Sequence, residues 1–253
     1  MFFNVDYSIT DEDAWFKAFP PRGKEKQWVD GYSAKEFAKA VLDKDFEKEI
    51  SRNLGLKRIN IDKKQVYPER GTSFDKIQGG VRSHDLACVA TKNDNEKIAL
   101  CFEAKVKETF GETIESELKN CTEGKRNRIE KLCRTFFGND YIKRQDKINK
   151  IFYQLLTGLA GTIAFAAETG ANESYFIVYQ LYPAICDNKD IITEHKNAIE
   201  AFLKQFVSQN DIVDVSNIKV EKNTPIDLGT IELEDGKGTS SVKIVFMEKS
   251  FIN

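Results

Sequence analysis

Hydrophobic residues recur along the chain with two spacings, one typical of helices and the other of strands. Between residues 33 and 52, apolar side chains follow at three- and four-residue intervals. Ser33 precedes this run and Glu36 follows three positions later, which is the spacing of a capping box. The same helical interval runs from about 146 to 168 and closes at Gly170, a residue suited to a helix C-terminus. We therefore predict helices at 33–52 and 146–168, with further helical segments at 112–136, broken near 121–124, and at about 194–208.

Shorter apolar runs without that interval predict strands. Residues 85–91 and 97–106 are two such runs, and residues 93–95 (Asn-Asp-Asn) between them suit a turn, because Asn and Asp tolerate left-handed backbone. Residues 174–182 form a third run, rich in aromatic side chains. Weaker patterns predict short strands at 64–67, 218–222, 228–234 and 241–248, and the rest of 53–84 is predicted to be irregular.

A hairpin centred on Asp94 places residues whose numbers sum to 188 opposite each other. Asp85 then faces Glu103, with Cβ atoms ~4.5–5.5 Å apart. Lys105 lies on the same face of the sheet, two residues beyond Glu103. The other face is apolar and is expected to pack against a helix; it carries Leu86, Cys88, Ala90, Ile98, Leu100 and Phe102.

The order of the predicted elements indicates one α/β domain with a mixed sheet flanked by helices. We expect this domain to span residues 1–210, and residues 211–253 to form a small β-rich extension packed on it. No internal repeat or low-complexity linker separates the two segments.

Composition and charge exclude some classes of protein. The five cysteines form no CxxC pair and the chain has two histidines, so neither a structural zinc site nor a disulfide framework is indicated. The N-terminus does not resemble a signal peptide, and no apolar window approaches the ~20 residues of a membrane helix. We therefore expect a cytoplasmic protein with no membrane partner.

The two acids and the lysine of the predicted hairpin suggest metal chemistry. Carboxylates held opposite each other repel, and Mg²⁺ (or Mn²⁺) relieves the repulsion by taking carboxylate, water and phosphate oxygens as ligands. A lysine beside such an ion can activate water or stabilise charge during phosphodiester hydrolysis. The same three residues also fit an ordinary surface ion cluster, worth ~0–1 kcal/mol.

The order helix, strand, hairpin, helix, strand resembles the αβββαβ core of the PD-(D/E)xK nuclease superfamily, the restriction-endonuclease-like proteins. Asp85 and residues 103–105 (Glu-Ala-Lys) occupy the positions of that superfamily's metal-binding and catalytic residues, although His84 stands where its name expects proline. The resemblance covers about 28–182 and extends to one bacterial branch. The segments that carry it are 28–34 (WVDGYSA), 67–69 (YPE), Gly79-Gly80, 83–85 (SHD), Glu108, Phe110-Gly111 and 153–156 (YQLL).

The resemblance implies two more site residues. A glutamate of the first helix joins the metal ligands in some members, and Glu49, with Glu47 next, fits that role or that of a solvated surface acid. Gln154 borders the apolar stripe of the 146–168 helix, where it can reach water or phosphate or cap a backbone group. The implied catalytic residues are Asp85, Glu103, Lys105 and Gln154, and the implied metal ligands are Asp85, Glu103 and Glu49.

The net charge of −2 requires any nucleic-acid partner to meet a local basic segment. Residues 119–150 hold ten Lys or Arg against four Asp or Glu. Such a segment attracts a phosphate backbone, but it also fits a solvated basic helix face. The residues expected to bind nucleic acid are Lys125, Arg126, Arg128, Arg134, Lys143 and Arg144.

These observations favour a Mg²⁺-dependent nuclease that cuts DNA in preference to RNA. The alternative is a nuclease-fold protein that binds or regulates without catalysis. A homodimer is a further expectation, because cutting both strands of DNA usually needs two active sites.

Overall fold

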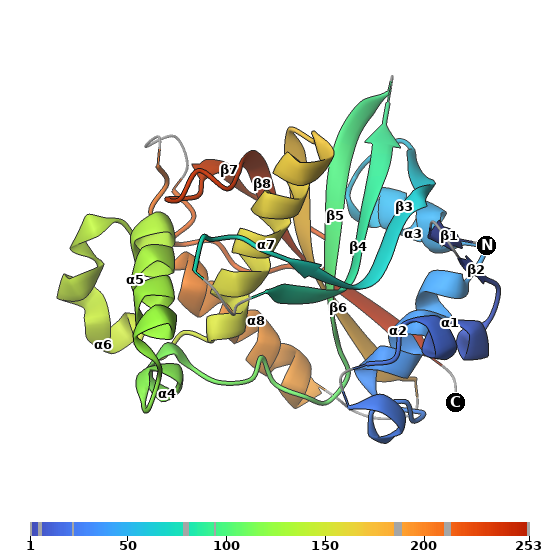
Figure 1. Cartoon of the computed structure of the whole chain (residues 1–253), viewed down its shortest axis with the longest axis horizontal. Helices are drawn as coiled ribbons and strands as arrows, with labels where there is room; N and C mark the ends of the chain where they lie inside the picture. The colour runs from blue at the N-terminus through green and yellow to red at the C-terminus, as the bar shows by residue number, and fades with distance from the viewer. Residues whose placement is uncertain are drawn as a thin grey trace.

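A six-stranded mixed sheet runs through the centre of the protein (Figure 1). The structure, a computed structural model, describes residues 2–4, 7–21, 23–77, 81–93, 95–184, 189–209 and 214–251. The strand order is β3-β4-β5-β6-β8-β7, in which β6 pairs parallel with β5 and with β8 and the other three pairs are antiparallel. The sheet strands are β3 (Ile59–Thr72), β4 (Arg82–Lys92), β5 (Glu96–Lys105), β6 (Glu173–Pro183), β7 (Ile226–Glu232) and β8 (Thr239–Phe251).

Helices cover both faces of this sheet (Figure 1). On one face α2 (Ser33–Leu42) and α3 (Phe46–Asn53) pack on the apolar side of β4, β5 and β6. On the other face α7 (Tyr153–Thr169) lies directly on the strands, with α5 (Glu123–Phe137) and α8 (Lys189–Leu203) beside it. The remaining elements are the hairpin β1 (Phe2–Asn4) and β2 (Tyr7–Ile9), the helices α1 (Glu12–Ala18), α4 (Ile114–Leu118) and α6 (Gln145–Ile148), and the 3-10 turns Lys24–Lys26 and Asn139–Arg144.

The predicted α/β class and the hairpin register are confirmed. Residues 86–92 of β4 pair with 96–102 of β5 so that paired numbers sum to 188. Asn93 and Asn95 of the turn have positive φ, as expected for residues that tolerate it. The predicted apolar face, Leu86 to Phe102, packs on α2 and α3, and the residues that alternate with it contact α7.

The single helix predicted at 33–52 is wrong, because the chain breaks between α2 and α3. Asp43 has extended backbone, and its carboxylate accepts a hydrogen bond from the Asp45 N–H at 3.0 Å. This local Asx turn competes with the helix. The predicted capping box is also wrong: Tyr32 is the N-cap, and the Glu36 carboxylate accepts from the Gly31 N–H instead.

The long helix predicted at 146–168 divides into α6 and α7. Between them, the Asn149 and Ile151 carbonyls accept hydrogen bonds from the backbone of residues 114–115, so tertiary pairing replaces helical bonds. Gly170 ends α7 at φ 69°, as predicted. Near 112–136 the expected break separates α4 from α5, and α8 begins and ends about five residues earlier than the helix predicted at 194–208.

Two strand predictions were wrong. Residues 59–72, which were expected to be mostly irregular, form the fourteen-residue strand β3. The strand has a register shift between Ile61 and Val66, where a run of polar residues interrupts the alternating pattern that would have predicted it. Residues 218–222 form no strand and make one isolated bridge, from Lys222 to Phe246. The Gly79-Gly80 pair lies outside the described residues.

Close packing of α7 on β4 positions the outer end of the hairpin. His84 is fully buried, and its Nε2 lies 3.0 Å from the Gly158 carbonyl oxygen. A Cβ on Gly161 would lie 2.7 Å from the His84 ring, so only glycine permits this approach. His84 is therefore a packed residue between β4 and α7. Within the described residues, no helix has the length and apolarity of a membrane span.

Candidate active site

Asp85, Glu103 and Lys105 come together where the N-terminal half of β4 lies beside the C-terminal end of β5. The β4–β5 ladder ends at the Leu86–Phe102 pair, one residue short of the predicted Asp85–Glu103 pair. Beyond that point the Asp85 carboxylate accepts a hydrogen bond from the Ala104 N–H at 2.6 Å. Asp85 is thereby anchored to the middle of the Glu-Ala-Lys segment.

Glu103 is the centre of a buried polar cluster and is 4% exposed. Its Oε1 accepts from Lys105 Nζ at 2.8 Å and from Gln154 Nε2, while its Oε2 forms an ion pair with Arg82. Because a carboxylate only accepts hydrogen bonds, Gln154 must present its amide nitrogen to it. Donors from β4, β5 and α7 therefore satisfy a charge that would otherwise be costly to bury.

Lys105 is almost as buried, at 5% exposed, and its Nζ lies 5.6 Å from the centre of the Phe110 ring. Burial lowers the pKa of Lys105 to about 8, although the charges of Asp85 and Glu108 act in the opposite direction. A lysine with this pKa exchanges protons near neutral pH, as a general acid or base requires.

A third carboxylate, from Glu69, faces Asp85. The strand pairs on either side, Pro68 with Leu86 and Arg70 with His84, place Glu69 of β3 opposite Asp85. Burial, followed by the charge of Asp85, raises the pKa of Glu69 to about 8. Burial also raises the pKa of Asp85, against the opposing effects of Lys105 and the Ala104 N–H. Without a cation, burial and the repulsion between the two acids therefore favour a proton on at least one of these carboxyls.

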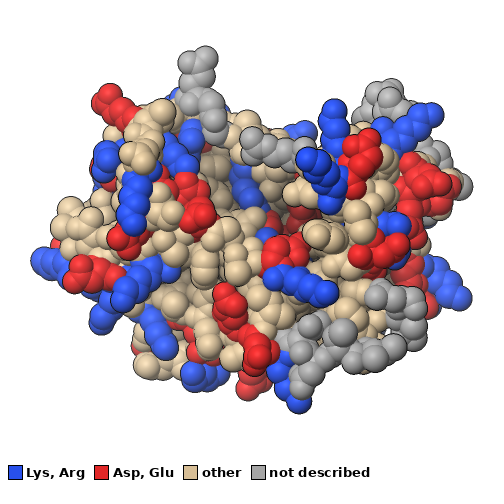
Figure 2. Space-filling model, turned by 90° about the horizontal axis from the view of Figure 1, so that it is seen from below, with Lys and Arg blue, Asp and Glu red and all other residues tan. Residues whose placement is uncertain are grey.

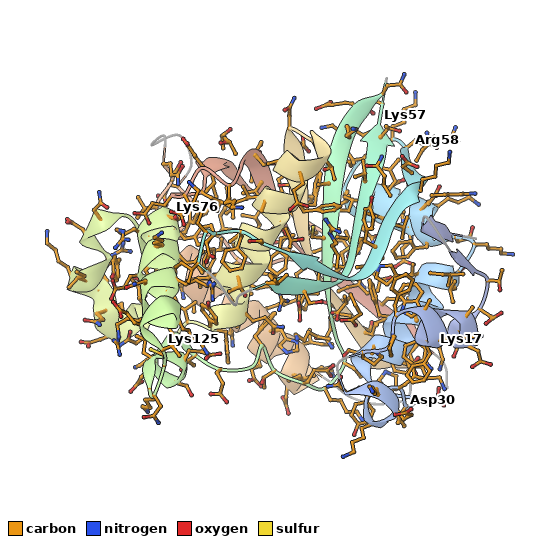
Figure 3. All side chains as sticks on the ribbon, in the orientation of Figure 1. Lys17, Asp30, Lys57, Arg58, Lys76 and Lys125 are labelled. Carbon is orange, nitrogen blue, oxygen red and sulfur yellow. The ribbon has the colours of Figure 1, made fainter. Side chains whose placement is uncertain are left out.

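These side chains line a cleft of about 620 Å³. One wall is the end of β5 with Glu69 and Asp85, and the other is the start of α2, residues 31–34. Ser33 hydrogen-bonds to Glu108, which lowers the pKa of that carboxyl against the effect of its burial. Asp30, labelled in Figure 3, marks this side of the molecule.

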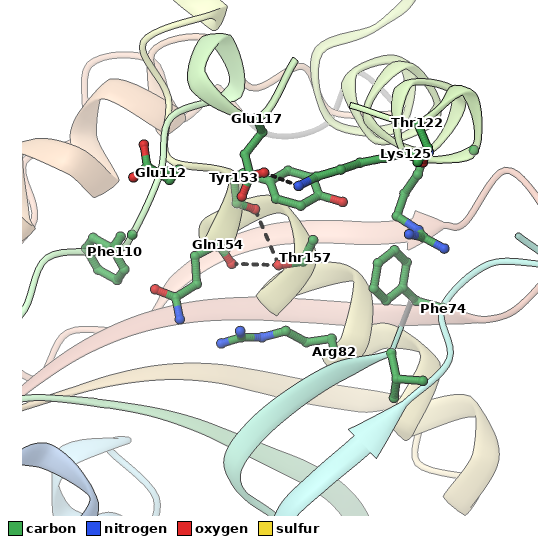
Figure 4. A pocket seen from close by; sticks show the side chains of 14 residues that line it. Phe74, Arg82, Phe110, Glu112, Glu117, Thr122, Lys125, Tyr153, Gln154 and Thr157 are labelled. Carbon is green, nitrogen blue, oxygen red and sulfur yellow. Dashed lines mark hydrogen bonds and ion pairs between the residues drawn. The ribbon is translucent and has the colours of Figure 1, made fainter. Parts of the chain in front are cut away.

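A second cleft has a volume of about 540 Å³ and is lined by residues of β4, α5 and α7 (Figure 4). Arg82 and Gln154, which both contact Glu103, lie near each other at one end of it. Tyr153 and Lys125 line the part nearer α5, where Lys125 is paired with Glu117. Residues of the Glu103 cluster therefore line both clefts, Arg82 and Gln154 in this one and Glu103 and Lys105 in the first. On the face shown in Figure 2, acidic and basic side chains are interspersed.

Glu49 is not brought to this cluster. Its carboxylate accepts from Tyr179 at 2.6 Å and from Lys249 at 2.7 Å, among the residues that pack on the α2–α3 face of the sheet. Across the part of the chain that the structure describes, no group of three or more His, Cys, Asp or Glu is arranged to hold a metal ion.

The predicted nucleic-acid-binding residues divide by their contacts. Three of the arginines already have partners within the protein. Arg128 is buried and forms an ion pair with Asp75, and Arg134 forms an ion pair with Glu234. Arg144 donates hydrogen bonds to the Phe137 and Gln205 carbonyl oxygens. Lys125 is paired with Glu117, and Lys143 with Asp140. Arg126 and Lys143 are exposed, so they remain accessible to a phosphate backbone.

Two residues of the cluster, Glu69 and Arg82, were not predicted. Arg82 lies three residues before Asp85, a position from which the sequence gives no hint of contact with Glu103. Glu69 could have been predicted from the β3–β4 register, which places it opposite Asp85. That register was not predicted, because the polar residues of β3 concealed the strand itself.

The fold and site define an α/β protein whose central sheet ends in a buried carboxylate–lysine cluster. The chain belongs to the family described as Domain of unknown function (DUF6946), whose model matches residues 8–234. That match includes the whole cluster. No curated protein and no solved structure matched the chain.

Proposed function

We propose that the protein is a metal-dependent nuclease that hydrolyses phosphodiester bonds, in DNA before RNA, and that α3, β3, β4, β5, α7 and β6 form a restriction-endonuclease-like core. The observation that carries the proposal is the convergence of Asp85, Glu103 and Lys105 at one end of a cleft. Their element order, second strand then third strand, is the one that the resemblance implies.

The donor set suits a hard divalent cation. Asp85 and Glu69 face each other, and burial and mutual repulsion disfavour their charged forms. Mg²⁺ needs only one or two protein carboxylates, because water and phosphate oxygens complete its ligands. Asp85 and Glu103, with Glu69 beside them, are therefore the residues proposed to hold Mg²⁺ or Mn²⁺. When bound, the ion would supply Lewis acidity and lower the pKa of water.

The chain's own side chains divide the remaining work. Lys105 is proposed to accept a proton from the attacking water or, when protonated, to stabilise charge on the phosphate, as its pKa of about 8 allows. Gln154 acts as a positioning residue, since its amide holds the Glu103 carboxylate.

The test measures metal binding and cleavage separately. Mn²⁺ binding is followed by calorimetry, and nicking of plasmid and cleavage of a labelled single strand are followed with Mg²⁺. Asp85→Asn should lose both activities, whereas Lys105→Met should keep metal binding and lose about 10²-fold or more in cleavage rate. Lys48→Ala, at a lysine of α3 that is 83% exposed, should behave as wild type. A wild-type protein that binds no metal and cuts neither substrate contradicts the proposal.

One observation favours a non-catalytic binding module. Both oxygens of Glu103 are already bound by Arg82, Lys105 and Gln154, as in a structural ion cluster. A module of this kind would bind nucleic acid equally well with and without metal and would release no product.

A further inference from the structure

An exposed aromatic ring stands at the mouth of the proposed catalytic cleft. Tyr32 is 53% exposed and lines the same cleft as Asp85 and Lys105, from the opposite wall. It is the N-cap of α2, and its backbone is held in place because the preceding Gly31 N–H donates to Glu36 at 2.9 Å. Gly31 has φ +83°, a conformation that favours glycine and turns the chain so that α2 starts at the cleft.

The same cleft also holds an exposed cation. Lys107 follows Lys105 by two residues, is exposed and lines the same cleft. Among the described residues its Nζ has no ion-pair partner, whereas Arg82 and Lys105 are both paired with Glu103. Lys107 is therefore a cation of this cleft that can contact a phosphate without breaking an ion pair.

The charge of the cleft restricts what else can attract a ligand. Its two lysines face five acids, Asp30, Glu69, Asp85, Glu103 and Glu108. Of the two lysines, Lys105 is paired with Glu103, so a phosphate gains little from charge alone and a group that does not depend on charge must add to the attraction. Stacking of a nucleobase on an aromatic ring is such an attraction, and it is open only to a base whose face is not covered by its neighbours.

We propose that the mouth of this cleft is a nucleotide subsite, in which an unpaired base stacks on Tyr32 and the adjoining phosphate contacts Lys107. The substrate is therefore a single strand, or a duplex with an unpaired nucleotide next to the bond that is cut. The inference rests on the proposed function for the place of the reacting phosphate, and it adds the substrate form.

The test is equilibrium binding to the full chain, measured by anisotropy of a fluorescein-labelled 12-nucleotide single strand with Ca²⁺ present. Tyr32→Ala should raise Kd about 5- to 100-fold, and Tyr32→Phe should restore binding because the ring remains. Lys107→Ala should reduce the slope of log Kd against log salt by about 0.7. Ile142→Ala removes an exposed apolar side chain outside the cleft and should bind as wild type. A fully paired duplex of the same sequence should bind more weakly and be indifferent to Tyr32→Ala.

The outcomes separate the two proposals. If the wild-type protein cuts nucleic acid but Tyr32→Ala and Ile142→Ala bind alike, the subsite is wrong and the nuclease stands. If the protein binds the single strand through Tyr32 but never cuts it, the nuclease is wrong and the subsite stands. Failure of the wild-type protein to bind any oligonucleotide overturns both.

Discussion

At the scale of single residues, Glu69 is the most unusual position of the site. Its φ is +50°, which few non-glycine residues adopt, and its carboxylate lies opposite Asp85. Strained backbone of this kind persists only where the surroundings impose it, and it gathers at functional sites. The strain and the repulsion between the acids both act against folding, so a bound cation that relieves the repulsion would stabilise the protein.

This cost predicts the behaviour of Glu69→Gln. The folded protein keeps a proton on Glu69 up to about pH 8, whereas the unfolded chain loses it near its ordinary pKa of 4.5. Wild-type stability therefore falls as pH rises from 4.5 to 8, and the neutral amide removes that loss. Without metal, we expect Glu69→Gln to melt a few degrees higher than wild type at pH 8 and at the same temperature as wild type at pH 4.5. We also expect the variant to bind Mn²⁺ about 10-fold or more weakly than wild type.

Differential scanning calorimetry and Mn²⁺ titration check these expectations. Glu123→Gln, a change to an exposed acid of α5 outside this cleft, is the matched control. Unchanged Mn²⁺ affinity in Glu69→Gln would exclude Glu69 from the ligands.

The sequence predicted Asp85, Glu103 and Lys105 because a short hairpin fixes their relations. Their contacts depend on one turn and one register, both visible in the order of residues. Arg82 and Glu69 join the cluster through the pairing of β3 with β4 and the packing of α7 against β4, which are tertiary events. The contacts of Glu49 with Tyr179 and Lys249 also depend on how α3 packs on the sheet, which the sequence does not reveal.

At the scale of elements, Glu173 at the start of β6 ties three strands together. It forms ion pairs with Lys92 of β4 at 2.5 Å and Lys243 of β8 at 3.0 Å, and it accepts a hydrogen bond from Tyr175. Burial alone would raise the pKa of Glu173, but these three partners outweigh it and lower the pKa to about 2. The interactions thus depend on an ionised carboxylate.

Protonation of Glu173 at low pH should break its ion pairs with Lys92 and Lys243. The folded pKa lies below the ordinary value of 4.5, so the stabilisation is complete above pH 4.5 and is lost as pH falls from there toward 2. Glu173→Gln should therefore lower the free energy of unfolding by about 1–3 kcal/mol at pH 7 and by much less near pH 2. Urea unfolding at the two pH values measures the difference. An equal loss at both would assign the effect to packing and not to charge.

Element boundaries were predicted where a local signal ended them. Gly170 and the Asn93–Asn95 turn stop their elements through their own backbone preferences. The breaks at Asp43 and at Asn149 were missed because apolar spacing continues across both. At the Asn149 break, hydrogen bonds from residues 114–115 replace the helical hydrogen bonds that are lost, and these partners are distant in sequence.

At the scale of the whole molecule, the C-terminal strands complete the central sheet. β8 lies between β6 and β7, pairs with β6 from Glu173 to Pro183, and contributes buried residues such as Val245 and Phe246 to both faces. The sequence indicated strands here but not their place, because parallel pairing between distant segments leaves no local pattern.

Removal of residues 222–251 should therefore abolish the fold. We expect the shortened protein to lack a cooperative thermal transition by circular dichroism and to precipitate, because β6 would expose a long unpaired edge. A chain that ends at Phe251 keeps β8 entire and should melt as the full chain does. Cooperative melting of the shortened protein would mean that β3 to β6 fold by themselves.

The position of β8 also governs how the protein is made. The strand that borders β6 begins some 56 residues after β6 ends. At synthesis rates of roughly 5–20 residues per second, the apolar edge of β6 is complete about 3–11 s before its neighbour exists. During that interval the growing chain offers the same pairing surface to other growing chains. The need for chaperones on the ribosome, and the yield of folded protein at a given expression rate, should therefore depend on how quickly this one stretch is translated.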